Sequence, residues 1–484
     1  MHLLTLQRLV GALLLLSGLW LLPPMAVSLY FDGISNSKPF AIAALIELAI
    51  GGAMFWPLRR QKTDLRVRDG FLIVVIAWLL FAISGALPMW LLKQPHISFA
   101  DGLFEAMSGL TTTGATVLTG LDDMPRGLLY LRSQLQWLGG MGIIVLAVAI
   151  LPMLRIGGMQ LFRAETPGPM KDSKLTPRIT ETAKALWLIY LIATIACGLA
   201  YWLAGMSLFD AINHAFTTMP IGGFSTHDAS IGYFQNPLIE FIAMLFMVIA
   251  GVNFTLHFIS WRDTSVNVYF QDPELRLYLL LLAVFVTIVT MQVLFQGIAT
   301  DFFSALRLGA FQAISAMTTT GYTTDAFYTW PGFVPIMLVI ISIMGGCAGS
   351  TAGGMKIVRV MLLSKQMVRE IRHLIHPNAV VAIKFSNRVI NDQVIGAVWA
   401  FFFLYVATIV CCGMLLHAIG LDLVTAFTAT VACLANLGPA LGAAGAHYGD
   451  LSDTAKLILS GIMLLGRLEI FTLVVLFTPA FWRD

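Results

Sequence analysis

Four short glycine-centred turns recur along this chain, and each one stands between a short half-polar segment and a long apolar stretch. The turns read TTTGAT, PIGGFS, TTTGYT and ANLGPA, and their central glycines are Gly114, Gly223, Gly321 and Gly438. These turn glycines are 109, 98 and 117 residues apart. A recurrence at nearly constant spacing indicates one structural unit that is used four times.

The composition places these units in a membrane. Hydrophobic residues make up 58% of the chain and charged residues 11%, and the mean hydropathy is +0.84, well outside the range of soluble globular proteins. A helix needs about 20 apolar residues to cross a bilayer. Stretches of about this length lie near residues 9–30, 40–58, 70–93, 128–152, 184–205, 237–261, 276–299, 332–360, 394–418 and 454–478. We predict an all-α integral membrane protein with about ten transmembrane helices.

Each unit contains a half-helix that is too short to cross the membrane. The four half-helices are expected near residues 101–111, 210–218, 304–318 and 423–434. The chain then divides into two extra N-terminal transmembrane helices (1–68) and four helix, half-helix, helix units (69–182, 183–275, 276–393 and 394–484). We predict a pseudo-fourfold arrangement of these units, with re-entrant half-helices.

Four re-entrant turns point to a pore, because irregular backbone at membrane depth is tolerated only where it is packed in protein or lines a water-filled path. Rings of backbone carbonyls can replace the hydration shell of potassium. The candidate filter residues are Thr111, Thr112, Thr113, Gly114, Pro220, Ile221, Gly222, Gly223, Thr318, Thr319, Thr320, Gly321, Ala435, Asn436, Leu437 and Gly438. Any single turn is better explained as a glycine C-cap of a helix, but four aligned copies favour a filter.

The third unit carries a glycine-rich run, IMGGCAGSTAGGMK, within its second apolar stretch. Because each glycine costs a helix about 1 kcal/mol relative to alanine, we predict a broken helix with a loop inside the membrane, directly below the filter. Its candidate gate residues are Gly345, Gly346, Gly349, Ser350, Thr351, Gly353 and Gly354. The alternative is a kinked helix whose glycines allow close helix packing.

Two cations complete the candidate gate. Arg467 lies beside the matched glycine of the fourth unit, and a charge at this depth usually faces a polar cavity or a partner. We expect it in the pore below the filter, where it would oppose a resident cation; the alternative is an ion pair with Glu469 or Glu47. Lys356 ends the glycine run and is either a snorkelling lysine or part of the gate.

Other polar residues point to structural roles. His214, His257 and His417 stand alone on apolar faces, the five cysteines lack metal-ligand spacing, and Asp210 is expected to cap a half-helix. No HExxH, GxSxG or phosphate-cradling GxxxxGK[ST] motif is present, so an enzyme is not expected. Basic clusters near 59–68, 155–178 and 356–372 predict cytoplasmic loops and cytoplasmic termini, and the opposite loops are acidic.

The motifs SGLTTTGAT, MPIGGFST, AMTTTGYTT, LANLGPALG, GGCAGSTAGGMK and GRLE together resemble the Trk/Ktr/HKT superfamily of potassium transporters, and most closely the membrane subunits of the bacterial Trk potassium uptake system. The resemblance covers essentially the whole chain. It implies a potassium-preferring filter, gating by the loop of the third unit, and a homodimer in the bacterial inner membrane. It also implies a separate cytoplasmic nucleotide-binding regulatory subunit, TrkA in that family.

The expected function is therefore channel-like potassium uptake through the filter, driven by the membrane potential. The alternative is a proton- or sodium-coupled potassium symporter. Potassium is the expected ion at the filter, with no organic cofactor on this chain, no nucleic-acid partner and membrane lipid around it. The second and fourth turns lack the TTTG pattern, so the number of ion sites stays open.

Overall fold

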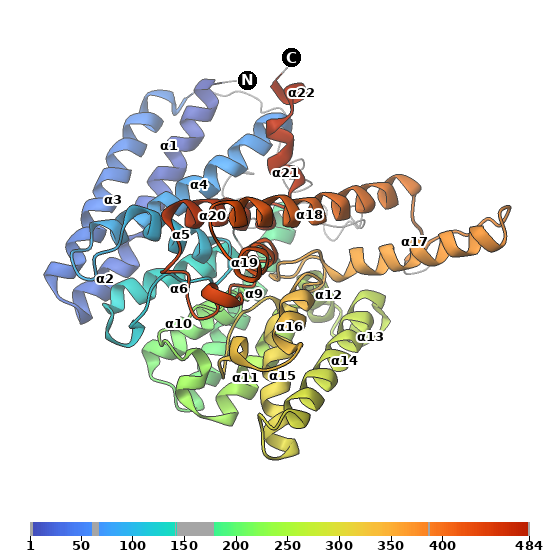
Figure 1. The fold of residues 1–484 in the computed structure, drawn as a ribbon. Helices are drawn as coiled ribbons and strands as arrows, with labels where there is room; N and C mark the ends of the chain where they lie inside the picture. Colours follow the sequence, from blue (N-terminus) through green and yellow to red (C-terminus); the bar gives the residue numbers. More distant parts are fainter. Residues whose placement is uncertain (1–2, 61–66, 141, 143–178, 386–387, 483–484) are drawn as a thin grey trace.

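The computed structural model describes residues 3–60, 67–140, 142, 179–385 and 388–482 (Figure 1). Helices make up almost all of its regular structure, which confirms the predicted all-α class. The helices are α1 (Leu3–Trp20), α2 (Leu22–Phe31), α3 (Ile34–Phe55), α4 (Val67–Leu91), α5 (Phe99–Leu110), α6 (Arg126–Gly140), α9 (Ile179–Leu203), α10 (Leu208–Thr218), α11 (Pro237–Ala250), α12 (Phe254–Arg262), α13 (Asn267–Gln271), α14 (Pro273–Phe295), α15 (Phe302–Thr318), α16 (Val334–Ser342), α17 (Ile357–Ile375), α18 (Asp392–Ala418), α19 (Leu423–Ala435), α20 (Asp453–Arg467), α21 (Phe471–Val474) and α22 (Pro479–Trp482). A small antiparallel pair, β1 (Lys384–Phe385) and β2 (Arg388–Val389), precedes α18.

Six of the described segments are long and apolar enough to cross a membrane, and two bent helix pairs raise the number to eight. The other two of the ten predicted stretches are not among these eight. The stretch 128–152 is described only as far as residue 142, and 332–360 is broken between α16 and α17. The basic residues of 155–178 lie outside the described residues, as do some of those in 59–68.

The predicted apolar stretches 237–261 and 454–478 are present as helix pairs that bend sharply. α11 and α12 meet at 89°, and α20 meets the following helical segment at 109°. The first bend follows Gly251, where Asn253 caps a new helix by accepting from the backbone N–H of Thr255. The second bend contains Glu469 and Ile470, whose φ angles are positive. A single glycine in an apolar run is compatible with a straight helix, so neither bend is evident from sequence.

The four units are arranged in a closed ring. The second helix of each unit packs on the half-helix of the next, and these contacts join α6 to α10, α11 to α15, α16 to α19, and α20 to α5. In Figure 1 the colours accordingly pass around the molecule from blue through green and yellow to red. The helices α1 to α3 pack outside the first unit, on α4 and α6. The predicted pseudo-fourfold arrangement is therefore present.

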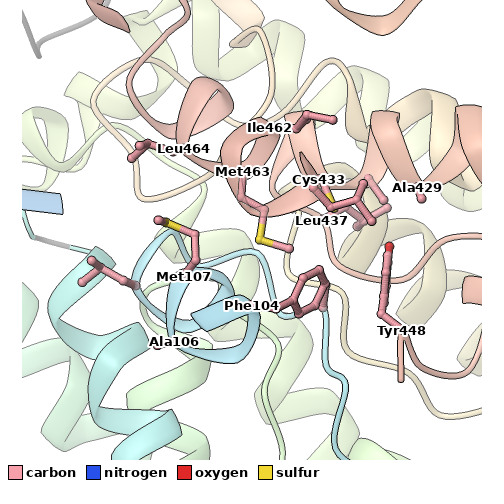
Figure 2. Packing of buried hydrophobic residues seen from close by; sticks show 14 of the residues in the cluster. Phe104, Ala106, Met107, Ala429, Cys433, Leu437, Tyr448, Ile462, Met463 and Leu464 are labelled. Carbon is pink, nitrogen blue, oxygen red and sulfur yellow. The ribbon is translucent and has the colours of Figure 1, made fainter. Parts of the chain in front are cut away.

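The contact that closes the ring joins the first unit to the fourth (Figure 2). Phe104 and Met107 of α5 lie against Cys433 of α19 and Met463 of α20 in one buried cluster. The ring of Phe104 also lies 5.3 Å from that of Tyr448. Burial of such apolar side chains stabilises the closed arrangement, at about 25 cal/mol for each Å² removed from water.

All four half-helices begin at a side-chain cap. Each N-cap oxygen accepts from the backbone N–H three residues later, and the caps are Ser98, Ser207, Asp301 and Asp422. Such caps satisfy backbone donors that would otherwise lack a partner at the helix start. The half-helices α5, α10 and α19 have 12, 11 and 13 residues, whereas α15 has 17, so only the third unit has a longer half-helix.

Candidate functional site: a ring of four glycine turns

The four turns share one backbone conformation despite their different sequences. The residue two positions before each turn glycine has a positive φ of 55°, 58°, 64° and 55°; these residues are Thr112, Ile221, Thr319 and Asn436. The turn glycines themselves have φ of 77°, 79°, 79° and 94°. Threonine and isoleucine are rare in this region of φ, and such strain persists where the surrounding structure imposes it, often at functional sites.

The hydrogen bonds of the turns are also repeated. In every unit the N–H just before the turn glycine donates to the carbonyl five residues earlier at 2.8 Å, in the pairs Thr113 to Ser108, Gly222 to Thr217, Thr320 to Ser315, and Leu437 to Ala432. The N–H one residue earlier donates to the carbonyl three residues before it, at 3.0 to 3.3 Å. These two bonds form a Schellman C-cap. The predicted C-cap alternative is therefore partly right, but the left-handed capping residue is not the glycine.

Each turn glycine instead lies against the backbone just before the turn glycine of the next unit. A Cβ on Gly114 would lie 2.1 Å from the carbonyl oxygen of Gly222, and a Cβ on Gly223 would lie 1.9 Å from that of Thr320. The same holds for Gly321 with Leu437 at 2.1 Å, and for Gly438 with Thr113 at 2.5 Å. Each turn glycine thus faces the carbonyl just before the turn glycine of the next unit, and the fourth turn returns to the first.

Side chains brace the ring. In the first turn the hydroxyls of Thr111 and Thr113 are 2.8 Å apart, and the matching hydroxyls of the third turn, on Thr318 and Thr320, are 2.7 Å apart. Asn436 of the fourth turn donates to the Thr113 hydroxyl at 2.9 Å, which links the fourth turn to the first.

The second turn has no threonine pair, and Gln136 of α6 supports it. The Gln136 side chain donates to the Gly222 carbonyl at 2.6 Å and accepts from the Phe224 N–H at 3.1 Å. Nothing in the sequence singles out this glutamine, because its partner lies in the next unit.

A cavity of about 410 Å³ opens on one side of the ring, and all four turn glycines contribute to its wall. Asp228, His227 and Asp325 also line it. His227 Nδ1 lies 2.5 Å from Asp122, and Nε2 lies 3.4 Å from Asp210. Burial alone would lower the pKa of His227, but the hydrogen bonds and charges of the two carboxylates outweigh it and raise that pKa.

The loop between α16 and α17, residues 343–356, lies against the opposite side of the ring; we call it the glycine loop. The helix is broken over this run, as predicted, and the kinked-helix alternative is wrong. Gly353 N–H donates to the Thr319 hydroxyl at 2.8 Å, and Gly354 N–H to the Ala435 carbonyl at 3.0 Å. The Thr351 hydroxyl donates to the Met219 carbonyl at 3.0 Å. The glycine loop is thus hydrogen-bonded to the second, third and fourth units at the ends of their half-helices.

The other predicted residues of the glycine loop shape its turns. Gly345, Gly349 and Gly354 have φ of 68°, 74° and 69°, which favours glycine. Gly346 accepts from the Ile357 N–H at 3.0 Å, and the Ser350 hydroxyl donates to the Cys347 carbonyl at 2.6 Å.

Arg467 joins the glycine loop to the first unit. Its guanidinium donates to the Thr351 carbonyl at 3.1 Å and to the Gly139 carbonyl at 2.7 Å. The two carboxylates proposed as its partners bond to other groups: Glu469 lies 2.7 Å from Arg359, and Glu47 accepts from Ser84 at 2.8 Å.

The side chain of Lys356 bonds to the backbone of the glycine loop itself. Its side chain is buried, and its Nζ donates to the carbonyl of Ala352. The snorkelling alternative is therefore wrong, since the amine does not extend toward an interface. Lys356 is the N-cap residue of α17 and has a positive φ of 75°.

A buried ion pair beside the first turn was not predicted. Arg132 of α6 lies 2.7 Å from Glu105 of α5, and both side chains are almost completely buried. Glu105 also accepts from the Val117 N–H, and Arg132 donates to the Ser225 carbonyl of the second unit. The sequence did contain a signal for this pair, because a charged residue within an apolar segment usually has a partner.

The residues assigned structural roles have such roles here. His214 bonds to the Asp210 carbonyl and the Ser225 hydroxyl, at 2.8 and 3.0 Å. The predicted cap at Asp210 is wrong, because Ser207 is the N-cap of α10 and Asp210 is its third residue. Asp210 accepts from the hydroxyls of Ser207 and Thr226 at 2.7 Å each, so it joins the cap to the loop after the turn. No group of three or more His, Cys, Asp or Glu among the described residues could hold a metal ion.

Known proteins resemble the chain over its whole length. A family model described as TrkH, cation transport protein, matches residues 36–483. The Trk system potassium uptake protein TrkH of Halomonas elongata is 51% identical over 98% of both chains, and that of Salmonella typhimurium is 48% identical over the full length of both. The crystal structure of the potassium transporter TrkH from Vibrio parahaemolyticus has 46% identity and a TM-score of 0.91, with 100% of each chain covered. These relatives are transporters, which agrees with the prediction that the chain is not an enzyme. The chain is a multi-pass membrane protein that belongs to the TrkH family of cation transport proteins.

Proposed function

We propose that this protein takes up potassium ions across the bacterial inner membrane through the ring of four turns. The observation that carries the proposal is the closed cycle in which each turn glycine faces the carbonyl before the next turn glycine. A closed ring of backbone from four units provides the geometry that cation selectivity filters use. The relatives named as potassium uptake proteins support potassium as the cargo.

The potassium ligands in this proposal are backbone carbonyls of residues 111–114, 220–223, 318–321 and 435–438. In each turn a residue with positive φ, a residue with negative φ and a glycine with positive φ follow one another. Such alternation directs successive carbonyls toward one side of the chain. It explains why Thr, Ile and Asn are all tolerated at the same position, because the ligand is the backbone.

The glycine loop is the gate in this proposal. Its contacts with three half-helix ends, and its link through Arg467 to the first unit, support a position across the exit from the ring. The guanidinium would oppose a cation that leaves the filter, and so limit how tightly ions are held. An inward-moving charge gains about 2.3 kcal/mol from a potential of 100 mV, so no enzymatic step is needed.

The regulatory partner belongs to the same proposal. The relatives are named as parts of a Trk system, and we infer a cytoplasmic nucleotide-binding subunit that docks on the basic loops and moves the glycine loop. A homodimer is the expected state of the membrane chain. The basic loops favour a cytoplasmic location for both termini.

The test of the function is potassium-dependent growth of a bacterial strain that lacks its own uptake systems, together with flux through the purified protein in liposomes. We expect growth at low potassium with the wild type and none with Gly114→Ser. In liposomes, potassium flux should exceed sodium flux. Equal rescue by Gly114→Ser would contradict the filter.

The symporter is tested in the same liposomes. The reversal potential of potassium flux is measured with and without a pH gradient, and with and without a sodium gradient. A channel gives a reversal potential set by potassium alone. A shift with either gradient would favour coupled transport.

A further inference from the structure

Glu274 stands outside the glycine loop and joins the middle of the loop to the start of α17. It is the second residue of α14, after the N-cap Asp272, and its side chain is buried. The same carboxylate oxygen accepts from the N–H of Ala348 at 2.7 Å and from the N–H of Val358 at 3.1 Å. Ala348 lies in the middle of the glycine loop, and Val358 is the second residue of α17.

This contact differs in kind from the bonds that join the glycine loop to the half-helix ends. The bonds to Thr319, Ala435 and Met219 join neutral groups, whereas the acceptor on Glu274 is a carboxylate oxygen, and hydrogen bonds to an ionised carboxylate are about twice as strong. Glu274 also interacts electrostatically with Lys356 of the glycine loop. A buried carboxylate depends on these donors, because an uncompensated buried charge is strongly destabilising.

We propose that Glu274 is a latch that holds the glycine loop in its closed position. The inference rests on the proposed role of this loop as the gate. One oxygen holds two N–H groups that are ten positions apart in sequence, so a movement of the loop away from α17 must break at least one of the two bonds. Glu274 therefore adds to the free energy needed to open the gate, beside the bonds of the loop to the half-helix ends and to Arg467. Glu274 is a positioning residue and does not contact the ion.

The test compares Glu274→Gln and Glu274→Ala with the wild type in liposomes, without any partner protein. We expect basal potassium flux to rise about tenfold or more in Glu274→Ala, on the scale of losing a charge-assisted hydrogen bond. The rise should be smaller in Glu274→Gln, because the amide oxygen still accepts. Glu240→Gln is the matched control, since Glu240 is a buried carboxylate on α11 that lies 3.5 Å from Arg307 and not at the loop.

A second readout reports the position of the loop itself. Cys347, next to Ala348, is only 1% exposed, so its reaction with a water-soluble thiol reagent measures opening. The measurement uses a background with Cys411→Ser and Cys412→Ser, which removes the two cysteines that are at least partly exposed. We expect faster labelling of Cys347 in both Glu274 variants and unchanged labelling in Glu240→Gln.

The outcomes separate the latch from the gate. Faster flux together with faster labelling supports both. Unchanged labelling and unchanged flux in folded Glu274→Ala and Glu274→Gln would overturn the latch and leave the proposed function intact. Faster labelling without faster flux would show that Glu274 holds the loop but that the loop is not the gate, which overturns that part of the proposed function. Thermal unfolding and elution as a single species establish that each variant is folded.

Discussion

The turn glycines allow a graded test of the ring. We expect Gly223→Ala to be the most damaging of the four alanine substitutions, because its Cβ would lie 1.9 Å from the carbonyl oxygen of Thr320. Restoring a tolerable 3.0 Å contact requires a shift of about 1 Å, and a shift of this size in a preorganised site can cost about 100-fold. The left-handed backbone at φ 79° adds about 1–2 kcal/mol for alanine. Gly438→Ala, with 2.5 Å to Thr113, should be the mildest.

The assay is potassium and sodium flux through each purified variant in liposomes, with thermal unfolding as a check on folding. Gly223→Ala should lose at least about tenfold in potassium flux or in preference over sodium, and Gly114→Ala and Gly321→Ala should be intermediate. The control is Gly461→Ala, because no atom lies within 4 Å of its Cβ position, and alanine favours its helix, α20. Wild-type flux and selectivity in folded Gly223→Ala would refute the argument that this ring forms the filter.

Three further predictions follow from the two sides of the ring. Arg467→Ala should raise single-channel current or weaken selectivity, and unchanged values in both would show that the guanidinium does not act on the ion. Shortening residues 346–353 should raise basal flux in liposomes, and wild-type flux would count against a gate. His227→Gln should lower the thermal unfolding temperature at pH 6 and have less effect as the pH increases. The pairing of His227 with Asp122 and Asp210 is fully present below the ordinary pKa of histidine, about 6.5, and is lost as the pH rises through the raised pKa. A difference that grows from pH 6 to pH 9 would contradict this assignment.

The positions of the turns were predictable because glycine leaves a signal in the sequence. A backbone that needs positive φ at Gly114, and at its three equivalents, selects the one residue without a Cβ. The other position with a positive φ, two residues before each turn glycine, is not marked by a glycine in the sequence. Only Asn436 is a residue type that adopts positive φ readily, while Ile221 takes the same conformation because the rest of the unit imposes it.

The contacts around the ring could be predicted in kind but not in detail. A half-buried charge such as Arg467 predicts a polar partner, yet its bonds to Gly139 and Thr351 join residues far apart in the sequence. The bend at Gly251 has a similar origin. Its carbonyl accepts from the N–H of Cys347 at 2.9 Å, so the glycine loop of the third unit helps to fix the end of a helix in the second.

The glycine loop and the filter cannot move independently if the ring conducts ions as proposed. The loop donates to the hydroxyl of Thr319, a residue of the proposed filter, and to the carbonyl of Ala435, another. Opening must break both bonds, so it changes the hydrogen bonding of two of the four turns. By reciprocity of linked equilibria, ion occupancy that alters the free energy of these turns alters the free energy of opening by the same amount. The break in fourfold symmetry that supplies the gate therefore also links gating to the ion, because the loop is bonded to the backbone and side chains that form the ring.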